Sequence, residues 1–87
     1  MSAEEPDGTD YVLFETLKSW RRREAAERAV PPYVVFHDRT LGAIASLRPR
    51  SLEALAEVPG IGPAKLAAYG RKILDLIGPS ESSGSKG

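Results

Sequence analysis

Five of the chain's seven prolines lie between residues 31 and 63, and their spacing limits the length of every helix that this sequence can form. Proline lacks the N–H that continues a helix, and it biases the preceding residue away from the α region. The segments between the prolines have helical periodicity, whereas the one short run with strand propensity has no partner run. We therefore expect an all-α protein, a compact bundle of four to five short helices.

The first helix is expected over residues 10–29, with Thr9 or Asp10 as its cap. Its apolar side chains recur at i, i+4 and i+7, namely Leu13, Leu17 and Trp20, which form a stripe that can pack on a core. We assign Trp20 to that core. The sequence Val-Pro-Pro at 30–32 ends this helix.

Residues 33–36 are expected to form an extended hydrophobic link between the first two helices, anchored to the core by its apolar side chains. The second helix is expected over residues 38–47, and the sequence Arg-Pro at 48–49 ends it. The inward positions of this helix are Leu41, Ile44, Ala45 and Leu47.

Ser51 is a good cap for a short third helix over 52–57. A tight turn follows at 58–62, and the fourth helix begins at Pro63, because proline suits the first helical position. Tyr69 belongs to its inward face. We expect the helix to bend or break at Gly70 and to resume over 71–77.

Composition excludes several classes of site. The 87 residues include no cysteine and one histidine, so disulfide bonds, cysteine-based zinc sites and histidine-pair metal sites are excluded. The carboxylates are scattered, and His37 has no nucleophile or carboxylate paired with it by spacing. We expect no catalytic residue, metal or cofactor. No apolar run approaches the roughly 18 residues of a membrane span, so we expect no membrane contact.

The zero net charge is the sum of two unequal parts. Residues 10–78 contain eleven basic and eight acidic residues and carry +3, whereas the ends carry −3. We interpret 1–9 as a disordered acidic tail, 10–78 as the helical domain, and 79–87 as a flexible Ser/Gly linker or tail. A mildly basic domain is compatible with nucleic-acid binding but does not require it.

The turn at 58–62 is the most informative local motif. Gly60 and Gly62 permit a close approach by a foreign backbone, and the next helix begins with unpaired N–H groups. Phosphate could bind there, with Lys65 adding positive charge. The alternative is a purely architectural turn with Ile61 in the core.

Two further features suggest contact with nucleic acid. The first is the basic face of the first helix, where Lys18 and Arg22 lie four residues apart beside Arg21, although such charges often only face solvent. The second is Tyr33, because an exposed tyrosine near arginines can stack on a base of a single strand. A tyrosine packed flat on the bundle is the alternative.

Three sequence blocks in this order closely resemble the HRDC domain (helicase and RNase D C-terminal), and the resemblance covers about 11–77. They are residues 13–21 (LFETLKSWR), residues 30–41 (VPPYVVFHDRTL), and residues 58–66 (VPGIGPAKL) with the Tyr-Gly pair at 69–70. The resemblance implies a five-helix bundle appended to RecQ-type helicases, some UvrD-like helicases and RNase D. It also implies that Tyr33 contributes to single-strand binding. Family members commonly have Ser or Asn where this chain has His37.

The function that we expect is an auxiliary, non-catalytic module of a bacterial, cytoplasmic DNA helicase, most simply RecQ-type, acting as a monomer. It would bind single-stranded DNA weakly, by stacking on Tyr33 and by neutralising phosphates with Lys18, Arg21, Arg22 and Arg39; Gly60, Gly62 and Lys65 form a second possible contact. The alternatives are docking to another protein or to other domains of the parent helicase, and RNA binding in RNase D.

Overall fold

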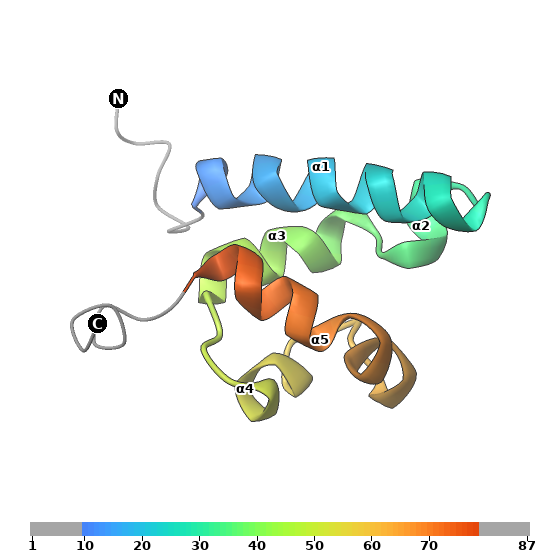
Figure 1. Ribbon diagram of the computed structural model, residues 1–87. Helices are drawn as coiled ribbons and strands as arrows, with labels where there is room; N and C mark the ends of the chain where they lie inside the picture. Colours follow the sequence, from blue (N-terminus) through green and yellow to red (C-terminus); the bar gives the residue numbers. More distant parts are fainter. Residues whose placement is uncertain (1–9, 79–87) are drawn as a thin grey trace.

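A computed structural model describes residues 10–78 of the chain. In this part there are five helices and no strand: α1 (Tyr11–Arg28), α2 (Pro32–Val35), α3 (Asp38–Leu47), α4 (Leu52–Ala56) and α5 (Pro63–Ile77) (Figure 1). The expected all-α architecture is confirmed. The two tails proposed for 1–9 and 79–87 lie outside the described residues.

The long helix α1 begins and ends at defined caps. The Asp10 side chain accepts a hydrogen bond from the Leu13 N–H at 3.0 Å, which satisfies one of the free donors at the helix start. Ala29 adopts the left-handed conformation (φ 57°) and donates to the carbonyls of Ala25 and Ala26. The predicted stripe of α1, which includes Trp20, is buried.

Residues 33–35 are helical and only Phe36 has an extended backbone, so the prediction of an extended link over 33–36 was wrong. Pro32 begins the four-residue helix α2, and the Phe36 N–H donates to the Pro32 carbonyl at 3.3 Å. The single turn buries Val35 and Phe36 and leaves Tyr33 and Val34 exposed. An extended strand would alternate inward and outward side chains, whereas a helical turn places two consecutive apolar residues in the core.

The next two helices follow their predicted bounds closely. α3 has the bounds expected of it, and its C-cap Arg48 is left-handed at φ 45°. Leu47 was expected to face inward but is 62% exposed, because it lies at the last turn of the helix beyond the buried Ile44 and Ala45. α4 ends at Ala56, and the Ser51 hydroxyl accepts from the Ala54 N–H at 3.0 Å, as its cap role requires.

α5 runs unbroken through Gly70, so the expected break at this residue is absent. The glycine serves packing instead: a Cβ there would approach Leu52 of α4 to 2.7 Å. Gly70 is therefore explained by the close contact between α4 and α5.

The helices enclose one core, in which three aromatic rings lie close together. The Tyr69 ring meets the Trp20 and Phe36 rings edge-on, each at 5.5 Å between centroids. α1 and α3 lie antiparallel, since the Asp10 N–H donates to the Ala45 carbonyl and Arg48 pairs with Asp10.

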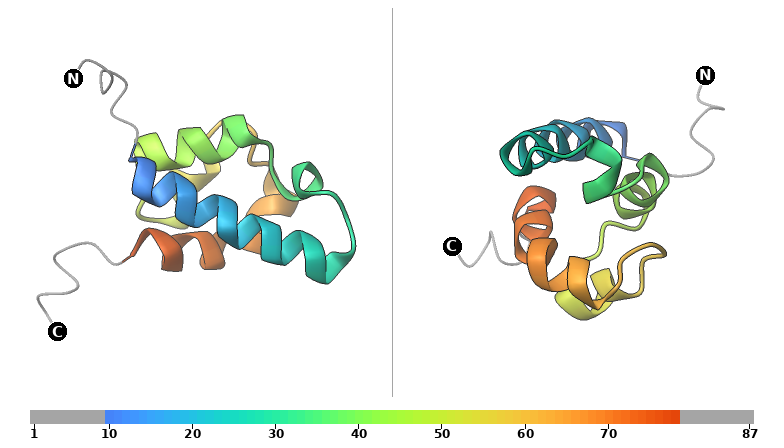
Figure 2. Two further views of the ribbon diagram at one scale, coloured as in Figure 1. Left: turned by 90° about the horizontal axis from the view of Figure 1, so that it is seen from above. Right: turned by 90° about the vertical axis from the view of Figure 1, so that its right-hand side faces the viewer.

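The start of α1 and the end of α5 lie at one end of the bundle, and α2 lies at the opposite end (Figures 1 and 2). This arrangement separates the ends of the described chain from Tyr33.

Candidate nucleic-acid interface

Tyr33 lies on the outer side of α2 with 60% of its surface exposed. Val35 and Phe36, on the buried side of the same turn, fix the direction in which Tyr33 points. The structure thus places the tyrosine where the stacking hypothesis needs it, and a tyrosine packed flat on the bundle is not what is observed.

His37 lies beside Tyr33. The two rings stack with their centroids 6.1 Å apart and their planes 22° from parallel. His37 is the N-cap residue of α3, but its side chain makes no capping hydrogen bond, and it is exposed. The imidazole is therefore not used to cap the helix.

A pocket of about 570 Å³ adjoins this ring pair, between the start of α3 and the turn that precedes α5. It is lined by His37, Asp38, Arg39, Thr40, Pro59 and Gly60. Two sites that are distant in sequence, Arg39 and Gly60, therefore meet around one hollow. The glycine turn and the Tyr33 segment, predicted as separate contacts, are neighbours through His37.

The two glycines of this turn have different roles. Gly60 has φ +95°, and a Cβ there would collide with the buried side chain of Thr40. Gly62 has φ −94° and open space where a Cβ would lie. Ile61 between them is buried, so the architectural role of the turn is confirmed.

Arg21 is drawn into the protein. Its Nη1 donates to the Phe36 carbonyl at 2.9 Å, and its Nη2 lies 2.7 Å from Asp38 Oδ1. Only 12% of its side chain is exposed. Its guanidinium thereby links α1 to the residues immediately before and after His37.

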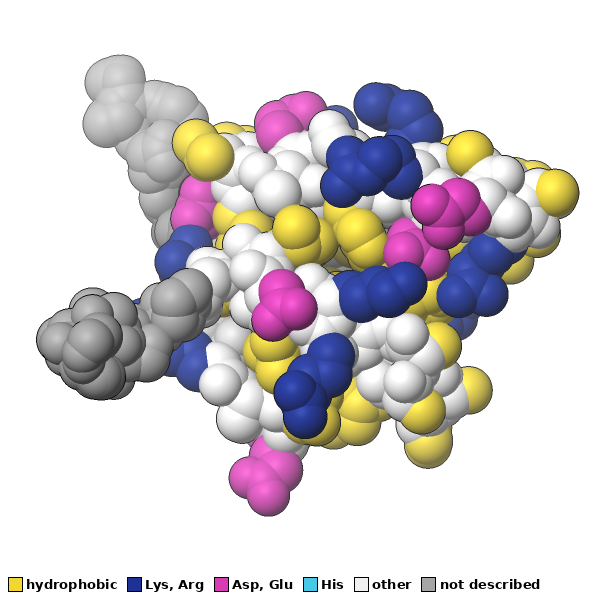
Figure 3. All heavy atoms as spheres, in the orientation of Figure 1, with side chains coloured by type: hydrophobic (Ala, Val, Ile, Leu, Met, Phe, Trp, Pro, Cys, Tyr) yellow, Lys and Arg dark blue, Asp and Glu magenta, His cyan; other side chains and the backbone are white. Residues whose placement is uncertain are grey.

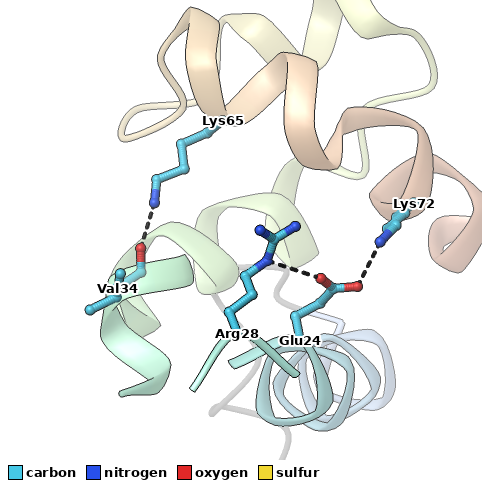
Figure 4. Close-up of polar contacts among 5 residues, drawn as sticks. All are labelled: Glu24, Arg28, Val34, Lys65 and Lys72. Atoms are coloured by element: carbon cyan, nitrogen blue, oxygen red, sulfur yellow. Dashed lines mark hydrogen bonds and ion pairs between the residues drawn. The ribbon is translucent and has the colours of Figure 1, made fainter. Parts of the chain in front are cut away.

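Lys65 makes an equivalent contact from α5. Its ammonium donates to the Val34 carbonyl at 2.5 Å (Figure 4). It also lies 5.5 Å from the centroid of the Phe36 ring. Arg21 and Lys65, both predicted as phosphate contacts, are engaged with the backbone of residues 34–36.

The remaining predicted cations are more accessible. Lys18 is half-buried, 3.3 Å from Glu15 and 4.8 Å from the centroid of the Phe14 ring. Arg22 and Arg39 are exposed. Figure 3 shows one face on which basic and acidic side chains alternate and on which no histidine is visible, so that face is not the one that carries His37.

The sequence reasoning missed a buried charge cluster between α1 and α5. Glu24 is 7% exposed and lies between Lys72, at 2.8 Å, and Arg28, at 3.5 Å (Figure 4). The hydrogen bond from Lys72 lowers the pKa of Glu24; the charges of Lys72 and Arg28 act in the same direction, while burial opposes them. Its signal in the sequence is the position of Glu24, four residues after Trp20 and seven after Leu17, on the apolar stripe.

Two other kinds of feature, a cluster of metal ligands and a membrane-spanning helix, are absent from the described residues. No group of three or more potential metal-binding side chains lies together among residues 10–78. Within the same range, no helix has the length and apolar character of a membrane span.

Comparison with known proteins agrees with this geometry. The family model of the HRDC domain matches residues 10–77. Over 68 of its residues, 78% of its length, this chain is 52% identical to the ATP-dependent DNA helicase UvrD2 of Mycobacterium tuberculosis. Over 65 residues, 75% of this chain, it is 43% identical to the ATP-dependent DNA helicase RecQ of Bacillus subtilis. The chain spans about a tenth of each relative, 10% and 11%.

Among solved structures, domain 3 of the D. radiodurans RecQ HRDC domains superposes with a TM-score of 0.72 and 46% identity, covering 75% of this chain and 86% of that one. The family match spans every helix described above, and the same five-helix architecture carries the exposed tyrosine, the glycine turn and the aromatic core. The chain belongs to the HRDC domain family.

Proposed function

We propose that this chain is an auxiliary, non-catalytic domain of a DNA helicase that binds single-stranded DNA weakly and so positions it for the parent enzyme. The observation that carries the proposal is Tyr33, a ring held outward at 60% exposure on a turn whose other side is buried. Stacking on an aromatic ring is worth about 1–3 kcal/mol per base and tolerates any sequence. The family membership and the helicase relatives support the same function.

The phosphates of the strand would meet the accessible cations. Arg39 lines the pocket beside Tyr33, and Arg22 and Lys18 lie on α1, which packs against α2 and α3. Each neutralised phosphate of a single strand contributes a slope of about −0.7 to the dependence of log K on log salt. Few contacts and a net charge of +3 for residues 10–78 give weak binding that falls with salt.

The test is a titration of the isotope-labelled chain with oligothymidine, followed by NMR at low and at high salt. Tyr33→Ala is expected to weaken binding about tenfold and to leave the melting temperature nearly unchanged. Tyr11→Ala is the matched control, because Tyr11 is also exposed, at 51%, but lies at the start of α1, at the other end of the bundle. Equal affinities of the two variants would contradict the proposal. An RNA oligonucleotide of the same length tests the RNase D alternative.

A second candidate function is docking to another domain of the parent helicase. Tyr11 and Val12 are 51% and 80% exposed and, with Glu15, Thr16 and Ser19, line a shallow hollow on the outer face of α1. Exposed apolar side chains of this kind suit a protein partner. No shift with any oligonucleotide at millimolar concentration would favour this function over DNA binding.

A further inference from the structure

The imidazole of His37 does not stabilise the start of the helix that it precedes. It caps nothing, it is exposed, and it is stacked on the residue proposed to hold a base. Serine or threonine at an N-cap would satisfy a free amide of α3, so a histidine here gives up a capping hydrogen bond. A side chain that is unfavourable for the helix and lies next to a binding residue is a candidate for ligand contact.

The surroundings of the ring give it a definite place in the site. His37 stacks with Tyr33 and also lines the pocket that contains Arg39 and Gly60. Because the two ring planes are 22° from parallel with centroids 6.1 Å apart, a base placed on the outer face of either ring would extend the same stack. The pocket that His37 lines, together with Arg39, could receive the sugar and phosphate of a base stacked on this ring pair.

The backbone on both sides of this ring is fixed. Arg21 donates to the carbonyl of Phe36 and pairs with Asp38, the residues immediately before and after His37. The His37 carbonyl in turn accepts the N–H groups of Thr40 and Leu41 at 3.1 and 3.2 Å. The ring is therefore presented from a rigid backbone, which reduces the entropy lost when a ligand is bound.

We propose that His37 is a direct binding residue for single-stranded nucleic acid, and that its ring and the ring of Tyr33 form one aromatic stack that a base can extend, next to the pocket lined by Arg39. This inference rests on the proposed function and names a second contact residue within the same site.

Two substitutions of His37 test whether an aromatic ring at this position is needed for binding. His37→Ser removes the ring and introduces a good N-cap, so it is expected to hold the melting temperature or raise it while weakening binding about fivefold. His37→Phe keeps a ring and is expected to bind oligothymidine within about twofold of the original chain. The probe is a fluorescent oligothymidine of about ten nucleotides at low salt, read by anisotropy.

The possible results divide cleanly. Weaker binding by His37→Ser together with retained binding by His37→Phe supports the stacking role. Unchanged binding by His37→Ser overturns it, and so does an equal loss in both variants, since the ring would then not be the contact. If Tyr33→Ala weakens binding while His37→Ser does not, the proposed function stands and this inference fails. If the original chain does not bind at all, both fail.

Discussion

Glu24 is the one charged residue of the described part, residues 10–78, that is buried. A carboxylate removed from water is unfavourable unless it is paired and hydrogen-bonded, and here Lys72 and Arg28 supply both kinds of contact from α5 and α1. The cations keep about half of their side chains exposed, so their own desolvation is modest. The cluster therefore holds α1 against α5 at small cost, provided that Glu24 stays ionised.

We expect Glu24→Gln to lower the free energy of unfolding by about 1–2 kcal/mol, less than the loss of a fully buried pair because the partners remain hydrated. The matched control is Glu27→Gln, an exposed position on the same helix, which should change stability by less than about 0.5 kcal/mol. Urea denaturation at neutral pH measures both.

The pH dependence of the same cluster has a definite sign. The folded-state pKa of Glu24 is lowered, so the unfolded chain binds the proton first as pH falls. The stabilisation is complete above the ordinary glutamate pKa of about 4.3 and is lost as pH drops through the lower folded-state value. The difference in stability between the original chain and Glu24→Gln should therefore shrink below about pH 4. A constant difference down to pH 2 would show that the ion pair does not cause it.

Substitution by alanine should distinguish the structural roles of Gly60 and Gly62 in the 58–62 turn. Gly60→Ala would force an L-residue into positive φ and drive its Cβ into Thr40, with an expected loss of about 2 kcal/mol or more. Gly62→Ala has an ordinary φ and open space and should be nearly neutral. Thermal unfolding of both variants compares them directly; equal melting temperatures would mean that the contact with Thr40 relaxes without cost.

At the scale of elements, α2 shows where inference from sequence succeeds and where it stops. The bounds of α3 and the caps of α1 and α4 follow from local chemistry, because capping residues and prolines act on their immediate neighbours. The four-residue apolar run of α2 has no periodicity long enough to separate helix from strand. Its conformation depends on Arg21 and Lys65, which lie 15 and 31 residues away from the carbonyls that they bind.

The candidate site likewise depends on contacts between residues that are far apart in the sequence. Tyr33 could be proposed from sequence, but the pairing of its ring with His37 and the meeting of Arg39 with Gly60 depend on how the helices pack. Likewise, the sequence identified Arg21 and Lys65 as cations without indicating that carbonyl groups inside the protein would bind them.

Lys65 is accordingly expected to support α2 and not to bind phosphate. Lys65→Met should weaken oligothymidine binding a few-fold, speed amide exchange in 33–36, and leave the salt dependence unchanged, because no phosphate contact is lost. Arg39→Gln, as the comparison, should flatten the slope of log K against log salt by about 0.7. A slope that is flatter by the same amount in Lys65→Met would assign that lysine to the phosphates instead.

At the scale of the whole molecule, charge is divided between the helical part and the first residues. Residues 1–9 contain three acidic and no basic residues, whereas residues 10–78 carry +3. Negative charge on the same chain lowers the local potential that attracts a polyanion, and salt screens this effect over about 10 Å at 0.1 M.

Removing residues 1–9 should therefore strengthen binding to oligothymidine a few-fold at low salt, and the gain should vanish at high salt. A variant with Glu4, Glu5 and Asp7 changed to Gln, Gln and Asn keeps the length of the segment and should give the same gain. If shortening helps but neutralisation does not, the effect comes from excluded volume and not from charge.

The placement of residues 10 and 78 at the end of the bundle opposite α2 has a consequence for how the domain could be connected to an enzyme. An 18-residue helix is about 27 Å long at 1.5 Å per residue, so α1 separates the two points where the chain continues from the ring that would hold a base. In the proposed function, the strand would therefore be held at the end of the domain that lies away from these two points. A change in the length of the segments before residue 10 and after residue 78 would then alter the distance that the site can reach. It would also alter the effective concentration at which the site meets a strand, with every contact in the site unchanged.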